Sequence, residues 1–125
     1  MKAIQLKRPV IKIPFEDDGK ELFVFEFEKT DKNYDQLFKT SDELEKELAA
    51  VQENPEATFE DLSAINRKAF DGLLGKGAYD KIYSVVPNFE DAYAIFIAIC
   101  ERIKEEISRE RLNQKKVIER YVNGK

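Results

Sequence analysis

The stretch that decides the fold holds three of the chain's five glycines within six positions. From residue 70 it reads Phe70-Asp71-Gly72-Leu73-Leu74-Gly75-Lys76-Gly77-Ala78-Tyr79-Asp80-Lys81-Ile82-Tyr83. Glycine tolerates positive φ and close backbone approach, so glycines gathered between two helical patterns predict a break in the chain. We therefore expect Gly72, Gly75 and Gly77 to be turn residues, with one helix ending here and the next beginning at Ala78.

On the N-terminal side of this break, residues 10–28 show the period-two alternation of a β-hairpin. A two-residue Asp-Gly turn would place Ile11 opposite Glu26, which is a poor pair on a buried face. We therefore expect a three-residue loop, residues 17–19, which places Ile11 opposite Phe25 and puts Gly19 in the left-handed position that such loops favour.

The apolar face of this hairpin, which includes Phe25 and Phe27, needs a cover because an isolated two-stranded ribbon is marginally stable in water. Either the helices of the same chain pack on that face, or strands of another chain extend the ribbon.

Apolar residues at the helical period predict four helices after the hairpin. Thr30 or Asp31, Thr58 and Asn88 are suitable N-caps, and proline follows the first and third helices. The second helix is expected to bury a stripe made of Phe59, Leu62, Ile65, Ala69, Phe70 and Leu73. The expected fold class is α+β and mostly helical, an N-terminal β-hairpin followed by about four helices, at residues 30–53, 58–74, 78–86 and from 89 onward.

The last helix is the longest, and its middle is apolar on every side because Ile95, Ile97 and Ala98 add to the periodic stripe. Such a helix is expected either at the centre of the domain or shared with another subunit. The whole chain, residues 1–125, is expected to form one domain. Its parts are a hairpin at about 10–28, a helical core at 30–107 and a charged C-terminal helical arm at 108–125.

Charge is distributed unevenly along the chain, although the net charge is only −4. Residues 16–61 carry 16 acidic and 5 basic side chains, whereas residues 101–125 carry 5 acidic and 8 basic ones. Two interpretations stay open: ordinary solvated faces, or a polarised surface that steers partners or copies of the chain.

Residues that carry catalytic chemistry are scarce. Histidine is absent, so the usual general base and the commonest metal ligand are missing. The single cysteine, Cys100, lies on an apolar helix face and is expected to be structural. Gly75-Lys76-Gly77 lacks the spacing of a phosphate-binding loop. We expect no enzyme activity and no catalytic, cofactor-binding or metal-binding residues.

Location and nucleic-acid binding can also be judged from composition. No window approaches the roughly 18 apolar residues of a membrane span, and the N-terminus lacks a signal-peptide core, so a cytoplasmic protein is expected. The basic residues of the last helix are interleaved with glutamates at helical pairing distances, which favours self-pairing over a nucleic-acid surface.

The stretch from Ala69 to Tyr121 resembles the small tail assembly chaperones of long-tailed (siphovirus-type) bacteriophages and prophages of Gram-positive bacteria. The resemblance is carried by residues 70–83, by the long helix of the Phe89–Ile107 kind that follows, and by the closing Lys116-Val117-Ile118-Glu119-Arg120-Tyr121-Val122. It implies a protein that is not an enzyme. Members of that family bind the helical tape-measure protein, keep it soluble and recruit tail-tube subunits in the host cytoplasm, and they are absent from the mature virion.

The resemblance implies apolar residues that cover a client helix. No cofactor is expected, and a homo-oligomer is expected to form through the hairpin edge, the long helix, or both. Each aromatic position also suits an ordinary core, so both interpretations stay open for every one of them. The alternative function is a small nucleic-acid-binding or regulatory interaction protein. The candidate interface residues are Phe25, Phe27, Tyr79, Tyr83, Phe89, Tyr93, Phe96 and Ile97.

Overall fold

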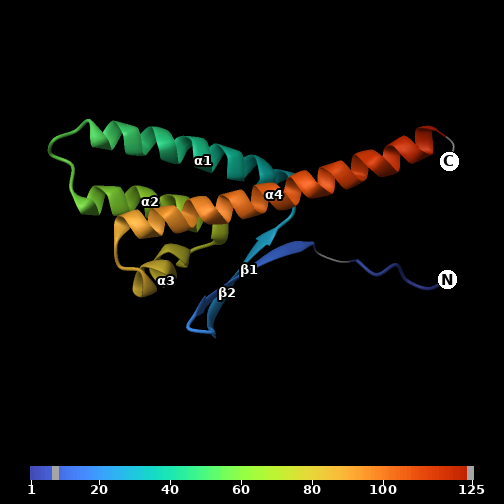
Figure 1. Ribbon diagram of the computed structural model, residues 1–125, viewed down its shortest axis with the longest axis horizontal. Coiled ribbons are helices and arrows are strands. Elements are labelled where there is room, and N and C mark those ends of the chain that lie inside the picture. Colours follow the sequence, from blue (N-terminus) through green and yellow to red (C-terminus); the bar gives the residue numbers. More distant parts are fainter. Residues whose placement is uncertain (7–8, 124–125) are drawn as a thin grey trace.

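The computed structural model describes residues 1–6 and 9–123, which form a β-hairpin followed by four helices (Figure 1). This arrangement confirms the mostly helical α+β fold with a long last helix. The elements are β1 (Val10–Asp17), β2 (Lys20–Glu28), α1 (Asp31–Gln52), α2 (Phe59–Leu74), α3 (Ala78–Val85) and α4 (Phe89–Val122).

The hairpin turn has two central residues, so the expected three-residue loop is wrong. Asp18 and Gly19 have φ of 50° and 79°, the pair of positive values that a type I′ turn requires and that Asp-Gly favours. A register shift after Phe15 then restores the apolar pairing, so that Ile11 lies opposite Phe27. A two-residue turn gives poor pairs only if the ladder is regular. Here a β-bulge moves the register by one residue. The alternation of side chains in the sequence does not reveal the bulge.

Helices of the same chain cover one face of the hairpin. Ile13, Phe25 and Phe27 are buried there, and the rings of Phe15 and Phe23 pack at the edge of the same face. The ring centroids of Phe15, Phe23 and Phe25 lie 5.1 to 5.5 Å apart. The two-stranded sheet therefore has the apolar cover that it needs for stability.

Side-chain caps begin three of the helices. Thr30, Thr58 and Asn88 each accept a hydrogen bond from a backbone N–H of the first turn, which confirms their expected roles. Asp61 completes a capping box with Thr58. Phe59 does not join the buried stripe of α2, because it lies at the first position of the helix and is 78% exposed.

The glycine-rich break separates α2 from α3. Gly75 and Gly77 have φ of 103° and 88°, values that favour glycine, and the Tyr79 N–H donates to an Asp71 carboxylate oxygen at 3.0 Å. Gly72 is not a turn residue, which corrects the sequence-based expectation. It lies inside α2, because the helix continues through the half-buried side chains that follow and ends only at Leu74.

Helices α2, α3 and α4 meet around Phe70. Its ring lies on α2 and contacts Tyr79 of α3 and Phe96 of α4, with ring centroids 5.6 and 5.1 Å away. The middle of α4 is not buried on all sides within the chain, since Ala94 and Ala98 are exposed, so the expectation of a fully central helix is wrong. The alternative, a helix shared with another subunit, stays a prediction. The apolar surface of this helix is wider than the core needs, and the surplus faces outward.

Helices α1 and α4 run antiparallel, and three side-chain contacts align them. Lys29 pairs with Glu110, the Lys104 ammonium lies 5.4 Å from the centre of the Phe38 ring, and the Ser41 hydroxyl lies 3.7 Å from the Cys100 sulfur. Beyond Glu110, α4 continues past the beginning of α1, and Figure 1 shows it projecting from the body. Residues 111–123 are all exposed. We call residues 111–122 the projecting arm; residues 124–125 of the expected arm lie outside the described residues.

Candidate interaction surfaces

Half of the expected interface residues are core residues. Phe25, Phe27, Tyr79 and Phe96 are each at most 5% exposed, so they offer no surface to a partner and the interface prediction is corrected for them. The cause is packing: one domain of this size has few large side chains with which to fill its centre, and the aromatic ones are used there.

The other four candidates retain exposed surface. Tyr83 is partly exposed on α3, where its ring stacks on Tyr79 at 5.5 Å between centroids. Phe89, Tyr93 and Ile97 are half-buried on α4. The structure therefore does not bring the four together into one site, because Tyr83 lies on α3 and, of the three residues on α4, only Phe89 and Tyr93 line the same groove.

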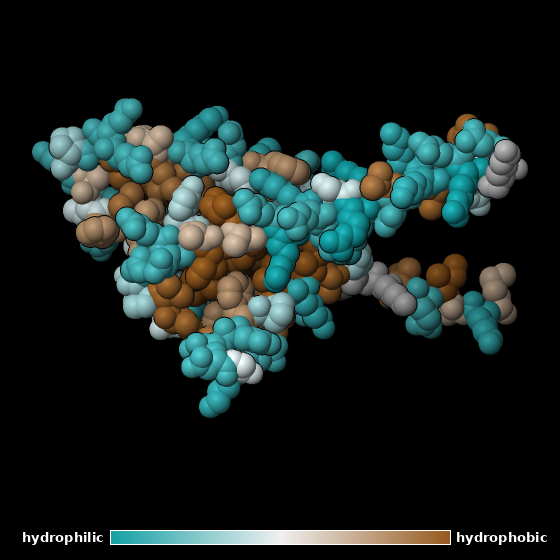
Figure 2. All heavy atoms as spheres, in the orientation of Figure 1, coloured by the Kyte–Doolittle hydropathy of each residue, from teal (hydrophilic) through white to brown (hydrophobic). Residues whose placement is uncertain are grey.

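Phe89 and Tyr93 line a groove of about 400 Å³ where the end of α1 meets the start of α4. Their rings stack with centroids 6.1 Å apart. In Figure 2, apolar atoms are visible between the two helices at this end of the molecule. We call this the end groove; its apolar floor and acidic rim are Leu48, Ala49, Phe89, Tyr93, Glu45 and Glu90.

A second groove, of about 380 Å³, lies between β1 and α4. Figure 2 shows apolar side chains gathered along the first half of α4 and toward α3 and the hairpin. We call this second site the hairpin groove; its apolar lining is Ile13, Pro14, Phe15, Ile95, Ala98 and Ile99. Sequence reasoning missed it, because period-two and helical patterns show which faces are apolar but not which strand meets which helix.

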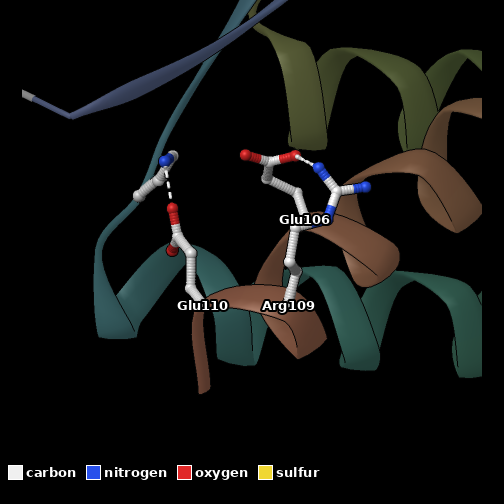
Figure 3. Close-up of polar contacts among 4 residues, drawn as sticks. Glu106, Arg109 and Glu110 are labelled. Atoms are coloured by element: carbon white, nitrogen blue, oxygen red, sulfur yellow. Dashed lines mark hydrogen bonds and ion pairs between the residues drawn. The ribbon is translucent and has the colours of Figure 1, made fainter. Parts of the chain in front are cut away.

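Polar contacts join the segment before α1 to α4 at the end of the body from which the projecting arm extends. Lys29 donates to the carboxylate of Glu110, and Arg109 pairs with Glu106 at 3.6 Å (Figure 3). The hydrogen bond to Glu110 raises the pKa of Lys29 above its ordinary value and outweighs the opposing effect of burial. This ion pair lies where α4 leaves the body and begins the projecting arm.

Few of the described residues have side chains that could take part in catalysis or metal binding. Cys100 is buried against Ser41, and burial raises the pKa of its thiol, so the unreactive protonated form is favoured. No group of three or more potential metal ligands comes together within residues 1–6 and 9–123. Over the same described residues, no helix has the length and apolar character needed to cross a membrane.

Asn66 is a buried polar residue that the sequence reasoning missed. It is completely buried in α2, and neither its amide nitrogen nor its amide oxygen has a hydrogen-bond partner among the described residues. The available signal was its spacing, four residues after Leu62 and four before Phe70, which places it on the apolar stripe.

Comparisons with known proteins assign a family but no activity. A search of curated proteins and a search of solved structures each gave no match. A family profile described as "Family of unknown function (DUF6673)" matches residues 19–125, which contain all four helices and the second strand of the hairpin. The chain therefore belongs to this family of unknown function.

Proposed function

We propose that the chain is a tail assembly chaperone, a binding protein rather than an enzyme. It binds a long helical tape-measure protein in the host cytoplasm, keeps it soluble and recruits tail-tube subunits. The proposal is supported by the resemblance of residues 70–83 and 116–122 to that family.

The hairpin groove is the observation that carries the proposal. It is open, apolar and formed by an edge strand and a long helix, a shape that suits the apolar face of an amphipathic helix. Ala98 is exposed in this groove, and its small side chain lets a client helix approach closely. Phe15 supplies an aromatic contact of the kind that dominates interface energies.

The lining of the hairpin groove is compatible with binding client helices of many different sequences. Its floor is aliphatic and aromatic, and its rim mixes Glu101 and Glu105 with Arg102, so neither charge sign is imposed on the client. Several copies bound along one long client would gain affinity from multivalency without a stronger single contact.

The direct test is co-expression with the tape-measure protein, followed by pull-down and sizing at low and high salt. We expect a soluble complex that survives high salt because the contact is apolar, whereas the client alone is insoluble. Ala98→Asp in the hairpin groove should abolish the complex. The matched control is Ala64→Asp, the same change at an exposed position of α2 away from both grooves.

Two results would overturn the proposal. One is a client that stays insoluble beside well-folded wild-type protein. The other is an Ala98→Asp variant that keeps its normal thermal unfolding and still recovers the client as well as Ala64→Asp does, which would exclude the hairpin groove as the binding site.

A further inference from the structure

The apolar face of α4 continues beyond the body of the protein. Ile103 and Ile107 are buried on that face. Val117 and Tyr121 follow them by two heptads each, and Ile118 lies next to Val117. Since two heptads correspond to about four helical turns, Val117 and Tyr121 lie within about 40° of the buried face. The face that packs inside the body is thus repeated on the projecting arm.

On the arm this face has no partner within the described chain. Val117, Ile118 and Tyr121 are 53%, 61% and 86% exposed. Basic side chains surround them, since the arm contains Arg111, Lys115, Lys116 and Arg120 against a single acidic residue, Glu119. An exposed apolar stripe flanked by one sign of charge is typical of a docking surface.

The end groove has the complementary character. Its floor is apolar, Glu45 and Glu90 stand on its rim, and none of the residues that line it is basic. It lies at the opposite end of α4 from the arm. Because about 25 residues of continuous helix separate Tyr93 from Ile118, roughly 38 Å lie between them, and an arm cannot reach the groove of its own chain.

We propose that the projecting arm of one copy docks in the end groove of a second copy. Val117, Ile118 and Tyr121 cover the apolar floor, and the basic side chains of the arm face Glu45 and Glu90. Since arm and groove lie at opposite ends of α4, two antiparallel copies can exchange arms in a closed two-fold dimer, or head-to-tail repetition can give a ring or a filament. This inference does not rest on the proposed client, which is assigned to the hairpin groove.

Two variants of the full chain each remove one half of the contact. The arm variant is Ile118→Asp with Tyr121→Asp; its control is Leu112→Asp, an exposed residue on the opposite side of the arm. The groove variant is Ala49→Arg, with Ala50→Arg as its control at the exposed neighbouring position outside the groove. All substituted positions except Ala49 lie outside both grooves, and all are exposed, so thermal unfolding should match the wild type.

Sedimentation at increasing protein concentration measures the association. We expect the wild type and both controls to associate, with weakening as salt rises from about 0.1 M to about 0.5 M. The arm variant and the groove variant should each stay monomeric, with association weakened at least about tenfold. Mixing the two variants should restore a one-to-one dimer, because one intact arm then meets one intact groove.

The variants and their mixture distinguish docking of the arm in the end groove from a contact between two arms. If the groove variant associates like the wild type, the arms pair with each other and the inference is overturned. The inference is also overturned if the wild type stays monomeric at every concentration. It is likewise overturned if the wild type associates but the mixture of the two variants stays monomeric. Client pull-down through the hairpin groove is measured separately, so either proposal can fail without the other.

Discussion

Lys29 and Glu110 form an ion pair across 81 positions of sequence, joining the residue before the cap of α1 to the last turn of α4 that lies within the body. Their side chains are 18% and 35% exposed. The pair marks the point at which α4 stops being a packed helix and becomes a projecting arm (Figures 1 and 3).

Breaking this pair should cost little stability at neutral pH. Lys29→Met is expected to lower the free energy of unfolding by under ~1 kcal/mol, because partly exposed ion pairs are screened by water. The raised pKa of Lys29 means that its contribution is complete below about pH 10.5 and is lost as the pH rises through the higher folded-state value. Urea unfolding of wild type and variant should therefore differ at pH 7 and converge as the pH rises through the raised folded-state pKa of Lys29, and a gap that does not narrow with rising pH would contradict this assignment.

The break between α2 and α3 should be sensitive to side chains at Gly75 and Gly77. An added Cβ would meet no atom within 4 Å at either position, so the cost of Gly75→Val or Gly77→Val is backbone strain alone. We expect a loss of about 1–3 kcal/mol in the free energy of unfolding. Unchanged urea midpoints would show that this turn tolerates ordinary residues.

Gly72 provides a control of opposite sign. It lies inside α2, its φ is not positive, and a Cβ added there would meet no atom within 4 Å. Gly72→Ala should therefore stabilise the helix by roughly 0.5–1 kcal/mol. Thermal unfolding of the two kinds of variant should shift in opposite directions.

The hairpin face should be essential for folding. Phe25 and Phe27 are buried, and each truncation is expected to cost about 3–5 kcal/mol, so Phe25→Ser with Phe27→Ser approaches the whole stability of a small domain. Far-ultraviolet circular dichroism should show an unfolded chain at 37 °C. Val24→Ser, on the exposed side of β2, should leave the spectrum unchanged; a double variant that unfolds no more easily than this control would mean that the hairpin is not packed on the helices.

Cys100 should resist thiol reagents while the protein is folded. Its burial raises the pKa of the thiol, and the reactive thiolate is therefore suppressed. We expect slow labelling at pH 8 that becomes fast in urea, whereas Ser108→Cys in a Cys100→Ala background should label at once because position 108 is exposed. Equal labelling rates at the two positions would show that α4 is open to solvent at Cys100.

Asn66 should be replaceable by an apolar residue. Burying an amide without hydrogen bonds costs about 1–3 kcal/mol, so Asn66→Leu is expected to preserve or raise the urea midpoint. A strong loss of stability would show that the amide is hydrogen-bonded in the folded protein.

Much of the local structure could be predicted from the sequence. The caps at Thr30, Thr58 and Asn88 and the positive φ of Gly75 and Gly77 depend on neighbouring residues alone, and they were expected correctly. The prediction that Gly72 is a turn residue was wrong, because a single glycine does not end a helix whose apolar stripe continues.

The candidate surfaces were harder to predict from the sequence. Aromatic residues were expected at an interface, yet Phe25, Phe27, Tyr79 and Phe96 are in the core, while Phe89 and Tyr93 line the end groove. A helical pattern shows that a residue is apolar, but it does not distinguish the side of α4 that faces α2 from the sides that face outward.

The sequence by itself determined the elements, their order and the first residues of the helices, because period, caps and glycine conformations are local properties of the chain. Only the tertiary structure decided the bulge that lets Ile11 meet Phe27, the antiparallel alignment of Lys29 with Glu110, and which of the aromatic side chains are buried. These features depend on contacts between residues far apart in sequence, whose free energy comes from burying apolar surface jointly rather than from any single segment.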